Sequence, residues 1–220
     1  SANKQKIPVP PIDIQKQIVE EIGKVEKECE STQIKILDCK EEISQLINIC
    51  FSKYETMTID NISTSVEYGT SSKSEKKGIV PVIRMGNIQN GEIDWTDLVY
   101  TSDEAEIAKY ALKKNDILFN RTNSPELVGK VGIYRGERPA IFAGYLIKIN
   151  YKKELILPTY LLHVLNSKQM REHGFSVMSK SVNQANINGT LLKAYRIPVP
   201  PMNEQKQIVE RLEALESEIT

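Results

Sequence analysis

Apolar positions between residues 13 and 52 repeat at alternating intervals of four and three. The set is Ile18, Ile22, Val25, Cys29, Thr32, Ile36, Cys39, Ile43, Leu46 and Cys50, in which threonine is the single polar member. This heptad spacing is typical of a helix that packs against a partner helix. At 1.5 Å per residue the segment predicts a helix about 60 Å long. A shorter run repeats the spacing at Ile208, Leu212, Leu215 and Ile219. We expect it to pack against part of the first helix, and the rest of that helix to pack against another chain.

Each of these helical segments follows the same motif. Residues 7–22 read IPVPPIDIQKQIVEEI and residues 197–212 read IPVPPMNEQKQIVERL, so 11 of 16 positions are identical at an offset of 190 residues. Proline restricts φ and disfavours helix in the residue before it, so both Pro-rich stretches are expected to be extended. Asp13 and Asn203 stand where N-caps are needed. The chain therefore holds one complete period and the start of a second, which we expect to be truncated at residue 220.

The residues between the two helical segments predict a globular domain. Short runs rich in Val, Ile and Tyr predict strands, and two capped segments predict helices. The strands are expected at 79–88, 92–100, 116–120, 131–135 and 141–151, and the helices at 103–112 and 158–173. Asn90-Gly91 is typical of a hairpin turn between the first two strands.

The mixed order of these elements favours an α+β fold over a doubly wound sheet. We therefore expect one mixed α/β globular domain flanked by long helices that form a coiled coil. The predicted divisions are a Pro-rich lead segment at 1–12, a long helix at 13–54, a globular domain at 55–200 and the start of a second helix at 201–220.

The formal net charge is zero, but the charges are segregated along the chain. Residues 13–52 carry 5 lysines and 9 acidic residues, residues 53–200 carry 20 basic and 15 acidic residues, and residues 201–220 carry 2 basic and 5 acidic residues. A basic middle between acidic helices favours a domain that binds a polyanion. No apolar run is long enough to span a bilayer, and the first residues lack the apolar core of a signal peptide. With three cysteines, this predicts a cytoplasmic protein without a membrane partner.

Catalytic and metal-binding patterns are missing from the sequence. The three cysteines lie on the helical seam at separations of 10 and 11 residues, which suits apolar contacts better than zinc ligation. Val128-Gly129-Lys130-Val131 lacks the first glycine and the hydroxyl of a phosphate-binding P-loop. His163 and His173 fall on one predicted helix, where surface or core positions are expected. We therefore predict no active site, no metal and no cofactor.

Three polar loops instead carry side chains that can reach DNA phosphates and base edges. The candidate DNA-binding residues are Gly69, Thr70, Ser71, Ser72, Lys73, Arg84, Asn87, Arg121, Thr122, Asn123, Ser124, Lys130, Lys180, Asn183, Gln184 and Asn186. Each loop alone is a weak signal, because loops are usually polar. Together, in a domain with excess positive charge, they favour nucleic-acid binding.

These motifs resemble the specificity subunit of type I restriction–modification systems. The resemblance rests on Ile-Pro-Val-Pro-Pro-x-x-x-Gln-Lys-Gln-Ile-Val-Glu, present twice, and on the segments 68–71, 82–88, 116–121, 128–130 and 181–187. It implies a non-catalytic subunit in which two recognition domains alternate with two antiparallel helices, each domain reading half of a split double-stranded DNA site. It also implies methyltransferase subunits docked on the helices and a motor-nuclease subunit as a further partner.

Only one recognition domain is present, so the chain is either a fragment of a two-domain subunit or a half-size subunit that forms a homodimer. A different interpretation is a coiled-coil assembly protein whose globular domain binds a protein or a glycan. A third, an enzyme, is disfavoured by the missing catalytic motifs. DNA binding should weaken steeply with added salt, whereas a protein or glycan contact should not.

Overall fold

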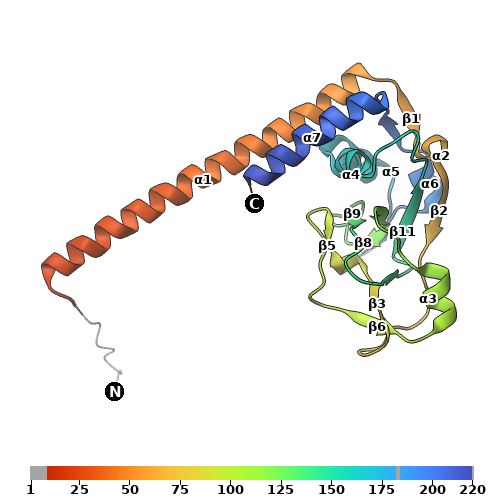
Figure 1. The fold of residues 1–220 in the computed structure, drawn as a ribbon, viewed down its shortest axis with the longest axis horizontal. Coiled ribbons are helices and arrows are strands. Elements are labelled where there is room, and N and C mark those ends of the chain that lie inside the picture. Colours follow the sequence, from red (N-terminus) through yellow and green to blue (C-terminus); the bar gives the residue numbers. More distant parts are fainter. Residues whose placement is uncertain (1–8, 182–183, 220) are drawn as a thin grey trace.

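A computed structural model describes residues 9–181 and 184–219, with backbone alone for Lys180 and Ser181. A single helix, α1 (Ile12–Lys53), projects as a rod from a globular domain, and α7 (Met202–Glu218) lies antiparallel along the part of α1 nearest the domain (Figure 1). This confirms the α+β class and the long first helix. No helix in the described part of the chain is both long and apolar enough to cross a membrane.

Both long helices begin at a proline. The N-cap residues are Pro11, with φ −52° and ψ 153°, and Pro201, with φ −52° and ψ 149°, and neither makes a side-chain cap. The prediction that Asp13 and Asn203 are the N-caps is therefore wrong. The fixed φ of proline already suits the entry into a helix, so the helices begin earlier and both polar residues lie in the first turn.

The predicted seam is buried along only part of α1. Cys39 and Cys50 are buried and Ile36, Ile43 and Leu46 are half-buried, whereas Ile18, Ile22, Val25 and Cys29 are exposed. On α7, Ile208, Leu212 and Leu215 are buried, and Ile219 is half-buried just beyond the helix. The expected packing of α7 against part of α1 is confirmed. Ile47 of α1 is buried as well and was not predicted.

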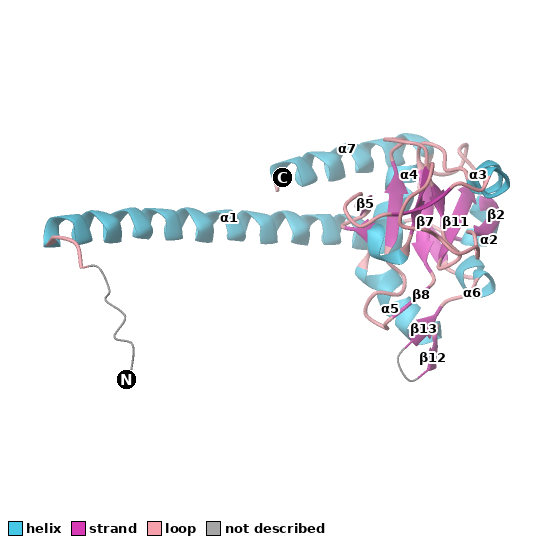
Figure 2. Cartoon of the chain, turned by 90° about the horizontal axis from the view of Figure 1, so that it is seen from below, coloured by secondary structure: helices cyan, strands magenta, loops and turns pink. Residues whose placement is uncertain are grey.

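Three polar contacts fix how far α7 reaches along α1. Lys53 forms an ion pair with Glu204 at 2.9 Å, and Arg211 Nε donates to Glu42 at 2.9 Å. At the other end, the Cys39 thiol lies 3.9 Å from the Glu218 carboxylate. The N-terminal part of α1 extends beyond this contact (Figure 2).

The globular domain consists of β1 to β14 and the helices between them. Its strands are β1 (Thr56–Thr58), β2 (Ser63–Tyr68), β3 (Val80–Ile83), β4 (Ile88–Gln89), β5 (Glu92–Ile93), β6 (Val99–Thr101), β7 (Asp116–Asn120), β8 (Thr122–Asn123), β9 (Val131–Tyr134), β10 (Ile141–Phe142), β11 (Leu146–Tyr151), β12 (Ser179–Ser181), β13 (Gln184–Asn186) and β14 (Arg196–Pro198). Its helices are α2 (Ile59–Ile62), α3 (Glu104–Tyr110), α4 (Pro158–Asn166), α5 (Lys168–Val177) and α6 (Gly189–Lys193), with a 3-10 turn at Met85–Asn87.

The centre of the domain is an antiparallel sheet of strand order β2-β11-β7-β9. Alternate residues of β7 point to opposite faces, as strand geometry requires. Ile117 and Phe119 join a core that also contains Tyr160 of α4, Cys50 of α1 and Leu212 of α7. Leu118, which lies between them on β7, joins a second core on the other face of the sheet. Because the first core includes both long helices, the domain and the end of the rod are packed as one unit.

Several predicted elements are shorter than expected. The segments 79–88, 92–100 and 141–151 each divide into two strands, because turns interrupt the apolar runs. The single helix expected at 158–173 is broken at Ser167, whose extended backbone (φ −64°, ψ 158°) ends α4 and whose hydroxyl caps α5. The hairpin turn at Asn90-Gly91 is confirmed. Its residues have φ of 51° and 83°, and it joins β4 to β5.

Candidate nucleic-acid interface

A hollow at one end of the central sheet, where β2 and β7 end and β11 begins, brings together candidate residues from two of the three polar loops. It is lined by Thr70–Ser74, Arg84, Arg121 and residues 143–145, and has a volume of about 420 Å³. We call it the loop hollow. Ser71, Ser72 and Lys73 are exposed on its rim. Hydroxyl and ammonium groups on such a rim can contact a phosphate backbone.

Arg121 lines the loop hollow and is held in place by two contacts. It directly follows β7, and its guanidinium carbon lies 5.0 Å from the centre of the Tyr68 ring. Its Nη1 donates to the carbonyl of Gly144 at 3.0 Å, and its Nε is buried without a hydrogen-bond partner among the described residues. A cation held by a ring and a carbonyl keeps its charge uncompensated, because neither contact is a carboxylate. Arg121 can therefore present positive charge to an anion.

Arg84 lies in the same hollow in a different electrostatic state. Its Nη2 forms an ion pair with Asp97 at 2.9 Å and also donates to the Asp97 carbonyl. The carboxylate offsets its charge, so Arg84 is a weaker candidate for phosphate than Arg121.

Four predicted contact residues are buried and support the loops from inside. Asn87 is 2% exposed; its amide oxygen accepts from Arg84 N, and its amide nitrogen donates to the carbonyls of Asp94 and Asp97. Thr70 and Thr122 are also buried, and the Thr70 hydroxyl bonds to Glu106.

Gly69, the fourth, packs so closely that an added Cβ would lie 2.2 Å from the carbonyl oxygen of Phe142. The structure therefore gives Asn87, Thr70 and Thr122 partners within the domain and packs Gly69 against backbone. Their contact with DNA stays a prediction, because loop polarity in a sequence cannot distinguish an inward from an outward side chain.

A second cluster lies beside Arg121 on the sheet β12-β13-β8. Asn186 donates to the Thr122 hydroxyl at 3.0 Å, and the two residues are register partners. Asn123 and Ser124 are partly exposed, and Gln184 is exposed. This hairpin projects from the domain (Figure 2). The backbone of Lys180 belongs to β12, its side chain is not described, and Asn183 lies outside the described residues.

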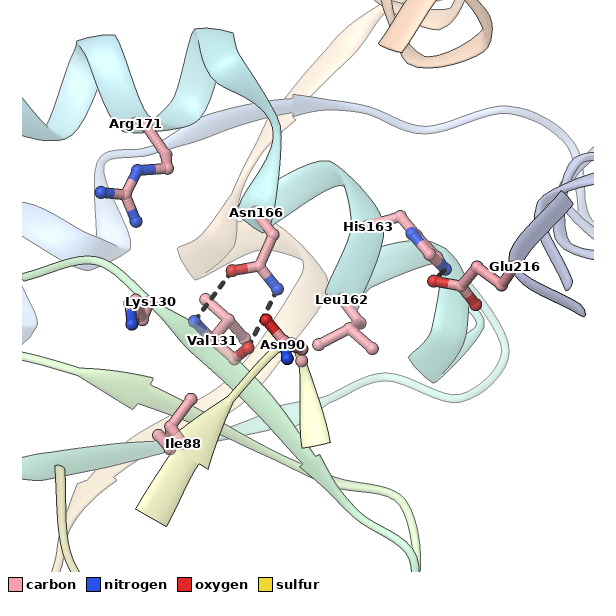
Figure 3. Close-up of a pocket in the computed structure, with 10 residues that line it drawn as sticks. Ile88, Asn90, Lys130, Val131, Leu162, His163, Asn166, Arg171 and Glu216 are labelled. Atoms are coloured by element: carbon pink, nitrogen blue, oxygen red, sulfur yellow. Dashed lines mark hydrogen bonds and ion pairs between the residues drawn. The ribbon is translucent and has the colours of Figure 1, made fainter. Parts of the chain in front are cut away.

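Lys130 lines a different pocket, between the β4–β5 turn, α4 and α7 (Figure 3). In this pocket, Asn166 bonds to both backbone groups of Val131, and His163 lies 3.6 Å from Glu216. Burial, together with the charge of Arg135, lowers the pKa of His163 to about 4, so the imidazole is neutral at pH 7. The His163 side chain is 10% exposed and lines this pocket.

His173 also has a structural contact, edge to face with Tyr195 at 4.6 Å. Within the described residues, no group of three or more His, Cys, Asp or Glu side chains is placed to hold a metal ion.

Two tyrosines beside the loop hollow were not predicted as site residues. Tyr68 lies under Arg121, and Tyr145 lines the hollow; they are 43% and 49% exposed. Exposed aromatic rings beside arginine are common in nucleic-acid interfaces because they can stack on bases or sugars. Proximity of tyrosine to the Arg121 segment is a tertiary feature, so the sequence offered no signal for it.

Comparisons of the sequence with protein families and with known proteins point to one family. Residues 52–220 match the type I restriction modification DNA specificity domain. The chain is 37% identical, over 163 residues, to a Methanocaldococcus jannaschii protein that carries the name of a type I restriction enzyme MjaX specificity subunit; the match covers 72% of this chain and 38% of that protein. It is 25% identical to the EcoKI specificity subunit of Escherichia coli, over 95% of this chain and 50% of the relative.

Solved structures show the same fold. The HsdS subunit from Thermoanaerobacter tengcongensis matches with a TM-score of 0.59 at 16% identity, over 97% of this chain and 53% of that one. The type I S subunit from M. genitalium matches with a TM-score of 0.60 at 14% identity, over 94% of this chain and 55% of that one.

The present chain spans half the length, or less, of the curated relatives named above. The family match nevertheless covers the whole globular domain and α7. The chain belongs to the type I restriction modification DNA specificity domain family.

Proposed function

We propose that this chain is the DNA-recognition part of a type I restriction–modification specificity subunit. Residues 55–200 act as one recognition domain that reads half of a bipartite site in double-stranded DNA. Residues 13–54 act as the spacer helix, residues 201–220 as the beginning of a second one, and residues 1–12 lead into the first. Family membership and the loop chemistry support this division.

The observation that carries the proposal is the convergence of separate polar loops around Arg121. The rim residues 71–73 approach it from one side, and the β8–β13 sheet continues from it on the other. Ile187 N donates to the Arg121 carbonyl at 2.9 Å, which ties the second cluster to the first. Phosphate contacts by Lys73 and Arg121 would position the domain. Exposed Gln184 and the partly exposed residues Asn123, Ser124 and Asn186 would reach base edges.

The exposed seam of α1 supports an assembly role for the helices. A continuous apolar stripe at residues 18–29 exposes more hydrophobic surface than a lone helix normally tolerates. We propose that the helices hold two recognition domains apart and dock methyltransferase subunits, and that a motor-nuclease subunit joins the complex. A half-size chain would provide the second domain by forming a homodimer. Methylation and cleavage then belong to the partner subunits, and this chain contributes recognition without catalysis.

Salt-dependent DNA binding by paired variants tests the proposal. The probe is a pool of duplex DNA with a randomised core, titrated at several salt concentrations. Wild type should bind with an affinity that falls steeply with salt. Arg121→Ala should bind about 5- to 150-fold more weakly, because one charged DNA contact contributes about 1–3 kcal/mol, whereas Arg121→Lys should recover part of the loss.

The matched control is Arg211→Ala, which removes the same charge from α7. It should bind DNA as wild type does. A wild-type chain without salt-dependent binding would contradict the proposed function, and unchanged binding by folded Arg121→Ala would remove the loop hollow from the interface.

A further inference from the structure

The two copies of the repeated motif have the same local shape. Both helices begin at a proline with φ −52°, and in both the helical N–H of the glutamine donates to that proline carbonyl at 3.0 Å. The glutamine side chain also folds back in the same way. Gln15 Nε2 donates to the Pro10 carbonyl at 2.7 Å, and Gln205 Nε2 donates to the Pro200 carbonyl at 2.8 Å. The motif therefore forms this shape by itself.

The surroundings of the two glutamines differ. Gln205 is completely buried. Its Nε2 also donates to the Leu155 carbonyl at 2.8 Å, and its Oε1 accepts from Leu157 N at 2.8 Å. Leu155 and Leu157 belong to the loop that leads into α4 of the globular domain, and Leu157 is the N-cap residue of α4. One side chain thus joins the motif, the helix and the domain.

Gln15 occupies the same place in the first copy without such a domain beside it. It is partly exposed, and the apolar residues that follow it are exposed too. Ile18 and Ile22 are 44% and 50% exposed, whereas their counterparts Ile208 and Leu212 are 9% and 0% exposed. The first copy has the conformation of the second but lacks its contacts.

We propose that the repeated glutamine acts as a latch, that is, a side chain whose hydrogen bonds hold a globular domain on the helix it belongs to. In this chain Gln205 forms the latch with its own domain, and Gln15 can form a second latch with another domain. A side-chain amide suits this role because it can donate and accept at the same time. The Gln205 amide donates to Pro200 of its own motif and to Leu155 of the loop, and it accepts from Leu157 of the loop. Gln205 is then a positioning residue: it fixes where the domain sits on α7 and leaves the DNA contacts to other side chains.

The same chemistry defines the partner of Gln15. It is a second domain of this fold, whose loop before a Pro-initiated helix presents a carbonyl and an N–H two residues apart. The equivalent loop of another intact copy of this chain is already filled by its own Gln205. A plain dimer of intact chains therefore cannot close the Gln15 latch by this contact.

Residue-resolved hydrogen exchange on the whole chain tests the closed latch, first without any substitution. The Leu157 amide of wild type should exchange as slowly as the central sheet amides, because its acceptor is a buried side chain. Exchange as fast as in exposed loops would overturn the latch. Gln205→Met keeps the length of the side chain but removes all three hydrogen bonds, and should speed exchange at Leu157 at least tenfold.

Two matched controls test whether the effect is specific to Gln205. Gln207→Met, on an exposed position of the same helix, and Gln15→Met should both leave Leu157 exchange unchanged in this chain. If Gln205→Met also leaves it unchanged, the glutamine only fills space and the proposal is wrong.

The open latch is tested by exchange at residues 9–25 in this chain and in the specificity subunit purified from its own cells. Exchange should be at least tenfold slower in the native subunit, and Gln15→Met should abolish that protection while Gln17→Met preserves it. Equal exchange in both proteins would overturn the second latch. Neither measurement uses DNA, so these outcomes are independent of the proposed DNA recognition.

Discussion

The two halves of α1 carry the same seam but have different surroundings. In the half nearest the domain, Ile47 and Cys50 are 2% and 1% exposed and share a core with α4 and α7. In the distal half, Val25 is 57% exposed although it lies on the same stripe. The period of the sequence thus determines which face of the helix is apolar, whereas the partner determines whether that face is buried.

The repeat makes this comparison stronger, because each seam residue of α7 has a counterpart in the distal half of α1. Leu212 corresponds to Ile22, and Leu215 to Val25. Ile22 and Leu212 end a stretch in which 11 of 16 positions are identical. Differences in stability between these two sites therefore reflect mainly tertiary packing.

The largest effect is expected from truncating the buried member of one such pair. Leu212→Ala should lower the free energy of unfolding by about 2–5 kcal/mol, because it removes a fully buried side chain from the shared core. Ile22→Ala, at the equivalent half-exposed position, should cost less than about 1 kcal/mol. Chemical denaturation of both variants measures the difference. Equal losses would mean that the distal half is packed in solution.

An intermediate effect is expected in the reactivity of the three seam cysteines. Cys29 is exposed, whereas burial raises the pKa of the Cys39 and Cys50 thiols and so lowers their thiolate fraction at pH 8. Iodoacetamide should modify Cys29 at least tenfold faster than the other two, because thiolate and access both limit the reaction. Mass spectrometry of a time course measures the rates, and the denatured chain serves as control. Cys39 reacting as fast as Cys29 would contradict the packing of α7.

The smallest effect is expected from Gly23→Ala in the distal half of α1. Apart from the glycine, its two chain neighbours and the nearby helix backbone, no atom lies within 4 Å of the added Cβ. Alanine should therefore strengthen the helix locally by about 1 kcal/mol. Amide exchange around residue 23 should slow by about fivefold, while the global free energy of unfolding changes by less than about 0.5 kcal/mol.

Gly174→Ala in α5 is the contrasting control for this substitution. Its added Cβ would lie 3.0 Å from the Tyr195 hydroxyl, so it should destabilise the domain instead. A global gain from Gly23→Ala would show that the distal half unfolds together with the domain.

Elements with a strong local pattern were predicted correctly. The long helix, the strand at 116–120 and the Asn90-Gly91 turn follow from near neighbours in the chain. The break at Ser167 was missed, because the residues directly after it, such as Lys168, Gln169 and Met170, favour helix as well. Only the cap of α5 reveals the break. Three segments predicted as single long strands each form two strands instead. A short turn between them was not recognised, because it hardly changes the proportion of apolar residues along the segment.

The sequence predicted which loops carry the candidate site residues, but not how these residues lie relative to one another in space. Arg121 and the rim residues 71–73 lie together, whereas Asn87 is directed inward and Lys130 lines another pocket. Gln205 escaped prediction because a polar residue between seam positions resembles a solvated one. Its presence in both copies of the repeat was the available signal.

The sequence by itself determined the phase of the seam, the repeat of 190 residues, the segregation of charge and the residue types of the loops. These are properties of neighbouring residues, which periodicity and composition record. Only the tertiary structure decided that α7 covers α1 from Lys53 to Cys39, that Gln205 is buried while Gln15 is not, and which loop side chains face outward. Burial depends on what distant segments pack against a position, and that information is not local in the chain.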